Sequence, residues 1–236
     1  MAESLIQCRD LSKAYGSNPA LAGCDLDLSP GQVVGLLGEN GCGKTTLLKV
    51  LAGVLADYEG EVRIAGHRPG PQSKSLVSFL PDAGFLPDAA RITDCIQMYR
   101  DFFADFNQAK AHDLLSFFGL QEPMRLRDLS KGMREKVQIA LATSRDARVF
   151  LLDEPISGID PAARQIILDG IVRNLEPDAL VFISTHLIHD LEPVLDAAVM
   201  MRHGQVLFAG QVDDLRAEHQ LSLDELFRKV YSWSAR

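Results

Sequence analysis

Short apolar runs alternate with stretches of helical periodicity along most of the chain. Continuous apolar runs predict strands buried on both faces of a sheet, and they occur at residues 33–37, 149–152 and 180–183. Residues 76–80 predict another short strand. Helical periodicity marks residues 44–51 and 162–175, which lie between such runs. The alternation is typical of an α/β architecture with a mostly parallel sheet.

The first 30 residues follow a different pattern. Residues 5–9 and 21–28 predict strands that are joined by the turn-rich residues 15–19. We therefore expect an N-terminal antiparallel β flank on the main sheet. Residues 197–201 and 205–209 predict a second hairpin, because His203-Gly204 between them is typical of a tight turn.

Residues 84–144 are helical in pattern and rich in phenylalanine. Seven of the 11 Phe residues fall between Phe79 and Phe118. We expect this segment to be a helical subdomain inserted into a core formed by residues 1–83 and 145–211, followed by a helical tail at 212–236. The Phe residues most simply form the subdomain core, and the alternative is that some of them form a docking surface for a partner helix.

The composition fits a globular protein with a substantial core. The chain has 236 residues, of which 47% are hydrophobic and 24% are charged, and this balance excludes a disordered chain or a small disulfide scaffold. The net charge is −8. Since nucleic-acid binding usually needs a basic face, we expect no nucleic-acid partner.

The sequence also favours a cytoplasmic location. No apolar run approaches the about 18–20 residues that span a bilayer, and the first four residues lack the basic region of a secretory signal. The four cysteines have no C-x-x-C spacing, which indicates reduced thiols. If the protein works at a membrane, another chain must supply the spanning segments.

A phosphate-binding motif follows the first buried run. Its sequence, which fits G-x-x-x-x-G-K-[ST], is Gly38-Glu39-Asn40-Gly41-Cys42-Gly43-Lys44-Thr45. Glycines let the backbone curl so that consecutive N–H groups face phosphate oxygens, and the following helix adds its positive end. Lys44 should reach the β- and γ-phosphates, Thr45 should bind Mg²⁺, and Thr46 should bind the α-phosphate.

Cys42 lies inside this motif. We interpret it as a small structural residue, with a reactive thiol of lowered pKa near the helix start as the alternative.

Two further buried runs end in polar residues with catalytic chemistry. Asp153 and Glu154 follow residues 149–152, at the strand end where doubly wound sheets bind ligands. Asp153 can hold Mg²⁺, and Glu154 can accept a proton from an attacking water. His186 follows residues 180–183 in the same way and can bind the γ-phosphate or that water.

Taken together, these motifs resemble the ATP-binding subunit of an ABC transporter, and the resemblance spans residues 11–210. It implies a P-loop NTPase fold, with ATP and Mg²⁺ as cofactors and ATP hydrolysis as the activity. By resemblance, Tyr15 in residues 11–16 stacks on adenine, Ser157-Gly158-Ile159-Asp160 is the loop that touches an opposite subunit, and His186 is the switch histidine.

Two positions depart from the family pattern. The signature, usually L-S-G-G-Q, reads Leu129-Ser130-Lys131-Gly132-Met133. Ser130 and Gly132 remain, and they can form an anion site at a helix start. Lys131 either adds favourable charge near the phosphate or faces solvent.

The second departure is Asp82, which stands where the family has a Gln. Its carboxylate can still bind Mg²⁺. The alternative is a turn residue after Pro81.

The resemblance also implies partners and a mode of action. Two subunits, as a homodimer or a heterodimer, would enclose two ATP molecules and drive a separate transmembrane permease at the cytoplasmic face of the membrane. The signature variant is similar to those of ABC-2 type bacterial exporters, which favours export. The alternative function is a soluble ABC ATPase in a cytosolic assembly complex, of the kind that delivers Fe–S clusters.

Overall fold

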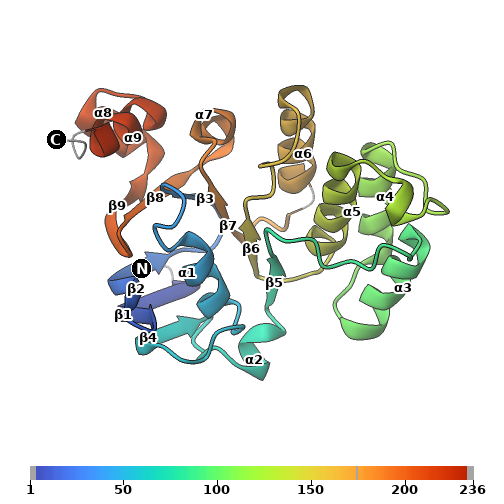
Figure 1. Cartoon of the computed structure of the whole chain (residues 1–236), viewed down its shortest axis with the longest axis horizontal. Helices are drawn as coiled ribbons and strands as arrows, with labels where there is room; N and C mark the ends of the chain where they lie inside the picture. The colour runs from blue at the N-terminus through green and yellow to red at the C-terminus, as the bar shows by residue number, and fades with distance from the viewer. Residues whose placement is uncertain (1–3, 174, 233–236) are drawn as a thin grey trace.

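A mostly parallel sheet forms the centre of the computed structural model, which describes residues 4–173 and 175–232 (Figure 1). Within these residues, six strands lie in the order β5-β6-β7-β3-β8-β9. Their bounds are β3 Gln32–Leu37, β5 Val77–Leu80, β6 Val149–Asp153, β7 Leu180–Thr185, β8 Ala197–Arg202 and β9 Gln205–Gln211. Only the β8–β9 hairpin is antiparallel. The predicted α/β fold is therefore confirmed.

The N-terminal strands form a sheet of their own. In the described part of the chain its order is β2-β1-β4, with bounds β1 Ile6–Tyr15, β2 Asn18–Leu28 and β4 Glu59–Ile64. The antiparallel flank is confirmed, but it is separate from the main sheet. Strand β1 also continues beyond residue 9, because a bulge between Cys8 and Leu11 places Asp10 at φ 47° and carries the strand through these polar residues.

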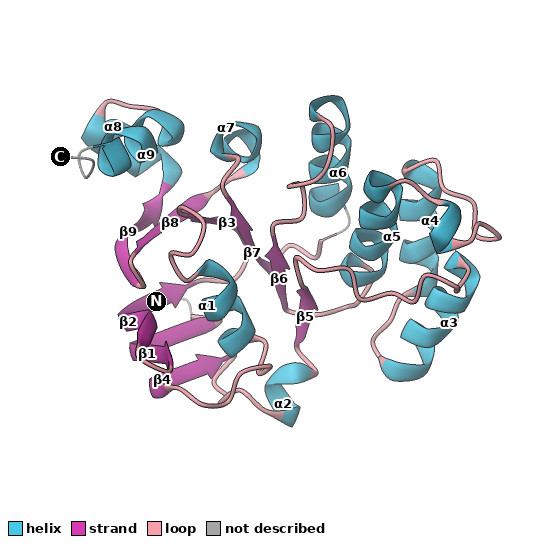
Figure 2. Ribbon diagram, viewed as in Figure 1, coloured by secondary structure: helices cyan, strands magenta, loops and turns pink. Residues whose placement is uncertain are grey.

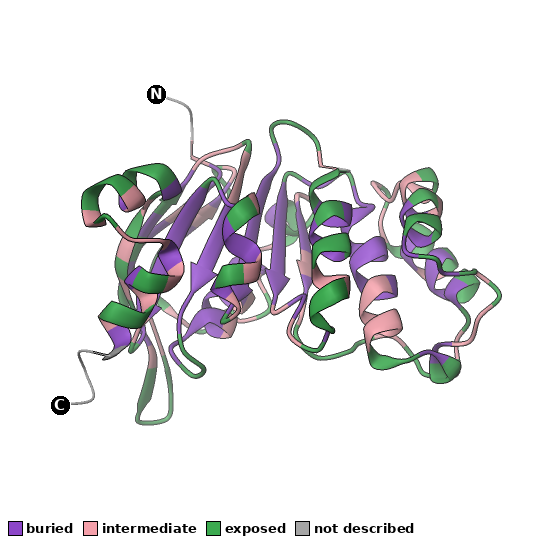
Figure 3. Cartoon of the chain, turned by 90° about the horizontal axis from the view of Figure 1, so that it is seen from above, coloured by how far each residue is buried: buried purple, intermediate pink, exposed green. Residues whose placement is uncertain are grey.

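Helix α1, Lys44–Leu51, lies between the two sheets (Figure 1). Its residues Leu47 and Leu51 belong to one buried cluster with residues of both sheets. Leu11 of β1 and Phe182 of β7 are members of the same cluster. Figure 3 shows the main sheet as a buried layer between more exposed helices. Because α1 is fixed on both sides, the phosphate-binding motif at its start is held by two sheets.

The segment between β5 and β6 is helical and lies at one end of the molecule (Figure 2). It contains α3 Ile92–Phe102, α4 Gln108–Phe117, the 3₁₀ turn η1 Leu126–Asp128 and α5 Lys131–Thr143. Asn107 starts α4, where its side chain accepts a hydrogen bond from the Lys110 backbone at 3.2 Å. Phe118 is buried, whereas Phe102 is 78% exposed and Phe85 and Phe117 are both 39% exposed. The core interpretation therefore holds for Phe118, and the docking surface stays a prediction.

Six further elements complete the fold of the described residues: α2 Pro71–Lys74, α6 Pro161–Arg173, α7 Ile188–Leu191, the 3₁₀ turn η2 Glu192–Val194, α8 Val212–His219 and α9 Leu223–Ser232. The last two helices form the predicted tail, of which residues 233–236 lie outside the described part. Across the described residues, every helix is too short or too polar to cross a bilayer.

A buried arginine joins the helical segment to the main sheet. Arg145, 4% exposed, donates to the Val77 carbonyl of β5 at 2.6 Å and to both Asp105 oxygens at 3.0 and 2.9 Å. Its guanidinium also lies 4.2 Å from the centre of the Phe103 ring. A buried charge is stable only when it is paired in this way, so this contact fixes residues 103–105 against β5.

We predict that Arg145→Met lowers the free energy of unfolding by about 2–4 kcal/mol, because the Asp105 carboxylate and the Val77 carbonyl lose their donors. Denaturant unfolding measures this change. The control is Arg63→Met, which breaks an exposed pair with Glu61 and should cost at most about 1 kcal/mol. Equal effects of the two substitutions would contradict the prediction.

Candidate functional site

The phosphate-binding loop, residues 38–43, connects the end of β3 to the start of α1. Gly41 and Gly43 have φ values of 83° and 111°, in the region that favours glycine. At Gly43 a Cβ would lie 2.4 Å from the Ala20 carbonyl oxygen, so no side chain fits there. The loop is therefore pressed against β2 of the other sheet.

Lys44 points its amine back across this loop. Its Nζ donates to the carbonyl oxygens of Gly38 at 2.7 Å and Glu39 at 3.2 Å, and it is only 6% exposed. The same Nζ lies 3.7 Å from Glu154 Oε1. A full positive charge is thus held at the mouth of the loop, where a polyphosphate would need it.

A pocket of about 200 Å³ opens beside the loop, and we call it the phosphate pocket. It is lined by Ala20, Asn40, Gly41, Gly43, Lys44, Thr45, Thr46, Asp82 and Glu154. Four segments that are far apart in the sequence therefore meet there. Asp82 faces the same space as Lys44 and Glu154, which favours the metal-binding interpretation over a simple turn residue.

Cys42 lies behind the loop. Its side chain is buried, and its Sγ would lie 2.4 Å from a Cβ on Gly38. Burial raises the pKa of the Cys42 thiol, and this outweighs the opposite effect of Lys44. The thiol therefore stays protonated, which favours the structural interpretation over a reactive thiolate.

Asp153 and Glu154 turn to different sides of the end of β6. Asp153 is buried, and its Oδ1 accepts a hydrogen bond from Ser184 Oγ at 2.6 Å. Glu154 has φ 50°, and its backbone N–H donates to the same Ser184 oxygen at 2.9 Å. Ser184 is the register partner of Asp153 on β7, so one hydroxyl orients both acids.

The Glu154 carboxylate lies between two nitrogen atoms. Its Oε2 is 2.9 Å from His186 Nδ1, while its Oε1 faces Lys44. Its side chain is 12% exposed and that of His186 is 39% exposed. A carboxylate that is oriented on both sides and open at the pocket has the geometry of a general base for a bound water.

Oxygen atoms at the phosphate pocket suit a hard divalent cation. Asp153 Oδ2 is buried and has no hydrogen-bond partner in the described part of the chain, which leaves one carboxylate oxygen for a ligand. The Thr45 hydroxyl and the Asp82 carboxylate are the other oxygen donors. This donor set fits Mg²⁺.

The protein does not supply a complete metal cage. Within residues 4–173 and 175–232, no three His, Cys, Asp or Glu side chains cluster as metal ligands. An ion at this pocket would need oxygens from a bound nucleotide, as Mg²⁺ does in phosphate sites.

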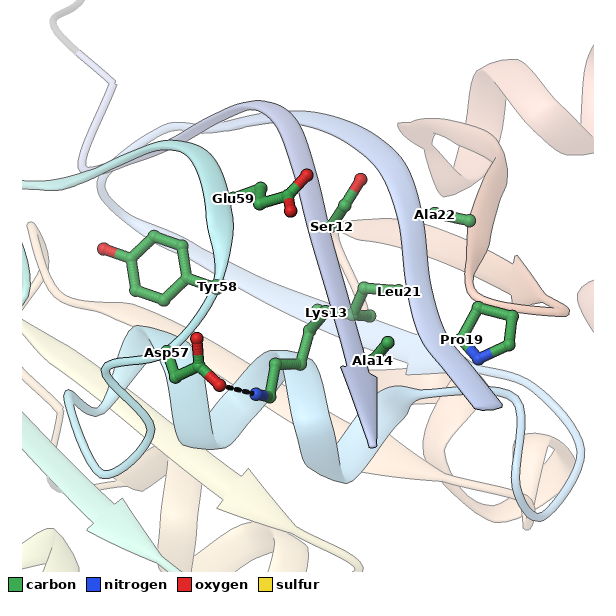
Figure 4. A pocket seen from close by; sticks show the side chains of 9 residues that line it. All are labelled: Ser12, Lys13, Ala14, Pro19, Leu21, Ala22, Asp57, Tyr58 and Glu59. Carbon is green, nitrogen blue, oxygen red and sulfur yellow. Dashed lines mark hydrogen bonds and ion pairs between the residues drawn. The ribbon is translucent and has the colours of Figure 1, made fainter. Parts of the chain in front are cut away.

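A larger pocket of about 450 Å³, the hairpin pocket, lies along β1 and β2 (Figure 4). It is lined by Ser12, Lys13, Ala14, Pro19, Leu21, Ala22, Asp57, Tyr58 and Glu59. Lys13 Nζ is 2.8 Å from Asp57 Oδ2 and 5.3 Å from the ring centre of Tyr15, which is 50% exposed. No residue of the phosphate-binding loop lines this pocket, so the phosphate pocket remains the candidate for the chemistry.

Ser130 and Gly132 lie at the start of α5, outside the phosphate pocket of the same chain. Ser130 is exposed, and its Oγ accepts from the Met133 backbone at 3.3 Å. A Cβ on Gly132 would meet nothing within 4 Å. The surface at this helix start is therefore open to a second molecule.

Lys131 lies against residues 157–160, the loop that is predicted to touch an opposite subunit. Its Nζ is 3.6 Å from Glu135 Oε1 and would be 2.3 Å from a Cβ on Gly158. Burial raises the pKa of Glu135, and Asp82 contributes in the same direction. Lys131 thus belongs to a contact between α5 and residues 157–160, in addition to the solvent-facing role considered from sequence.

Sequence reasoning missed Ser184. The available signal is that it ends an apolar run directly before Thr185 and His186, at the same strand end as Asp153. Only the parallel register of β6 and β7 shows that its hydroxyl reaches both acids.

Comparison with known proteins identifies the family. The model of the ABC transporter family matches residues 21–157. An aliphatic sulfonates import ATP-binding protein of Xanthomonas axonopodis is 34% identical over 70% of this chain and 67% of its own length. Nod factor export ATP-binding protein I of Cupriavidus metallidurans is 32% identical over 69% of this chain and 56% of its own length. The match thus spans little more than half of that relative.

Longer matches cover nearly the whole chain. The daunorubicin resistance ATP-binding protein DrrA3 of Streptomyces coeruleorubidus is 29% identical over 92% of this chain and 72% of its own length. Among solved structures, an ATP-binding subunit of an ABC transporter has a TM-score of 0.86 and 26% identity, over 97% of this chain and 100% of that one. The chain therefore belongs to the ABC transporter family and is similar to its ATP-binding subunits.

Proposed function

We propose that two copies of this chain, or one copy and a related subunit, hydrolyse MgATP and drive a separate membrane permease, with export as the direction. One observation carries the hydrolytic part: the Glu154 carboxylate lies between Lys44 Nζ and His186 Nδ1, at the phosphate pocket. This arrangement combines a base, a positive charge and a histidine that orients the base in one place.

Each residue then has a distinct task. Glu154 orients a water and accepts its proton, while Lys44 neutralises charge on the β- and γ-phosphates. His186 holds Glu154 from the other side and faces the γ-phosphate. The backbone N–H groups of residues 38–43, with the hydroxyl of Thr46, bind the remaining phosphate oxygens.

Magnesium is part of this proposal. Thr45, Asp153 and Asp82 would hold it, and the free Oδ2 atom of Asp153 supports the assignment. Bound there, Mg²⁺ would supply charge neutralisation at the β- and γ-phosphates.

Tyr15 is proposed to stack on the adenine ring. It ends β1 as the register partner of Asn18, on the hairpin that also carries Ala20 of the phosphate pocket. Its exposed ring has a free face for a base, and Lys13 lies close to the ring.

A head-to-tail dimer would complete the site. Ser130 is exposed and Gly132 is half-buried at a helix start, and neither lines the phosphate pocket of its own chain. Backbone N–H groups there can bind an anion, so a second subunit could place this surface on the γ-phosphate of the first. The dimer would then enclose two ATP molecules, each bound by both subunits.

The export direction rests on the subfamily resemblance. It is supported by the Nod factor export ATP-binding protein among the relatives, which also include a sulfonate import protein. The Lys131 and Met133 variant of the signature also favours export. The cargo would pass through the permease at the cytoplasmic membrane, so we propose a peripheral location on the cytoplasmic face.

We further propose that residues 84–144 act as a helical subdomain that docks the permease. Exposed phenylalanines lie on it, with Phe102 at the end of α3, and Phe85 is three residues beyond Asp82. An apolar surface near the phosphate pocket would link nucleotide state to a membrane partner.

Glu154→Gln is predicted to lower the ATPase rate by about 10²–10⁴-fold, because the amide cannot accept the proton of the attacking water. ATP binding should remain, and the variant should form an ATP-dependent dimer on a sizing column. Glu61→Gln, on the exposed side of β4, is the matched control and should retain activity. Full turnover by the Glu154 variant would reject the general-base role.

Complementation tests the shared site. Gly132→Glu should fold, since a side chain there meets nothing within 4 Å, but its charge would repel a phosphate from the partner. Lys44→Ala disables the other half of the site. Each variant alone should lose at least about tenfold in rate.

Mixing the two variants should restore part of the activity, because a mixed dimer contains one site with neither substitution. Gly132→Ala is the size control and should remain active. A mixture no more active than its components would contradict the head-to-tail arrangement.

Phe102→Glu is predicted to weaken membrane recovery by at least about fivefold, because a charge at an exposed aromatic anchor opposes docking. Quantitative fractionation of cells that carry the native permease measures this loss. Val54→Glu, at an exposed position outside residues 84–144, should fractionate like the wild type. Purely soluble behaviour of the wild type, with a cytosolic scaffold, would support the soluble alternative.

A further inference from the structure

Helices α8 and α9 contact the back of the phosphate-binding loop. In Figure 1 these two helices lie beside the end of the β8–β9 hairpin. Near the end of α9, the Tyr231 hydroxyl donates to the Met201 carbonyl of β8. The same hydroxyl oxygen lies 3.4 Å from the point that a Cβ on Gly38 would occupy. The last described helix thus reaches the first residue of the loop.

The phenol oxygen has partners on two sides. Besides its bond to Met201, it lies near the backbone of Glu39, which partly offsets the rise of the Tyr231 pKa. Burial is the larger effect and raises the pKa of Tyr231 to about 12. The hydroxyl therefore stays protonated near neutral pH and can bridge the loop and β8.

The Tyr231 ring is itself fixed. It is buried, lies 4.2 Å from the Phe227 ring between centres, and has the Arg202 guanidinium 5.7 Å from its centre. Such contacts limit the movement of the ring, so that its hydroxyl stays in one place.

A second contact fixes the start of α9. Glu192 is buried in η2, and its Oε1 accepts from the Leu223 backbone at 3.0 Å and from two Arg216 nitrogens at 3.0 and 2.7 Å. The helix pair is thereby also fixed to η2, which follows His186 by six residues.

We propose that Tyr231 is a positioning residue for nucleotide binding, because its hydroxyl fixes Gly38 and Glu39, the two residues whose carbonyls hold Lys44. The inference rests on the proposed phosphate-binding role of residues 38–46. It goes beyond that role by assigning a task to a helix that lines neither the phosphate pocket nor the hairpin pocket.

The test compares the full chain with Tyr231→Phe, which removes only the hydroxyl. We expect the Kd for MgATP by calorimetry to rise about three- to tenfold, the size of one lost buried hydrogen bond. The KM for ATP should rise with it, while kcat at saturating ATP should change less. Amide hydrogen exchange across residues 38–44 should become faster in the nucleotide-free protein.

Tyr99→Phe is the matched control, since it removes another buried phenol from α3, away from the loop. It should leave the Kd for ATP unchanged. Phe227→Leu keeps the hydroxyl but loosens the ring, so a smaller rise in Kd is expected. This variant keeps the proposal testable if Tyr231→Phe folds poorly.

Each outcome has one meaning. If the wild type binds ATP and Tyr231→Phe binds it equally well with unchanged exchange, the positioning role is rejected and the proposed function stands. A lower melting temperature with unchanged ATP affinity would also reject it, since that result describes a purely structural contact. If the wild type and Lys44→Ala both fail to bind ATP, the proposed function fails and this inference falls with it.

Discussion

The nucleotide site depends on two places where the backbone comes so close to its neighbours that only a hydrogen fits. At Gly43 the neighbour is the Ala20 carbonyl of β2, and at Gly38 it is the Met201 carbonyl of β8. The loop between these glycines is therefore shaped by both sheets at once. Any larger residue at either position would move the loop or separate the sheets, whatever the rest of the motif contains.

The catalytic side of the pocket follows from sheet register. Strands β6 and β7 are parallel neighbours, so Asp153 stands opposite Ser184, and the residues that follow each strand emerge together. The Ser184 hydroxyl makes a different hydrogen bond with each acid. It donates to the Asp153 carboxylate, and it accepts from the backbone N–H of Glu154, whose φ is positive. Adjacent carboxylates thereby receive different surroundings, which suits the different tasks proposed for them.

The sequence predicted most of the fold and the residues of the phosphate pocket, because their signals are local. Apolar runs marked the buried strands, and the spacing from Gly38 to Thr45 marked the loop. Asp82 could be considered as a pocket residue only by resemblance. The extension of β1 was missed because it depends on a bulge at Asp10 that polar residues alone do not reveal.

The remaining omissions involve contacts between distant parts of the chain. Lys131 against Gly158, and Tyr231 against Gly38, join residues whose separation in sequence carries no periodic signal. The Arg145 contact is of the same kind, and it has a mechanical consequence. One guanidinium holds Asp105 in the helical segment and Val77 at the start of β5, the strand that leads to Asp82. A tilt of the helices must either break these hydrogen bonds or move the strand, so force applied at the helical end would displace Asp82, the residue proposed to bind the metal.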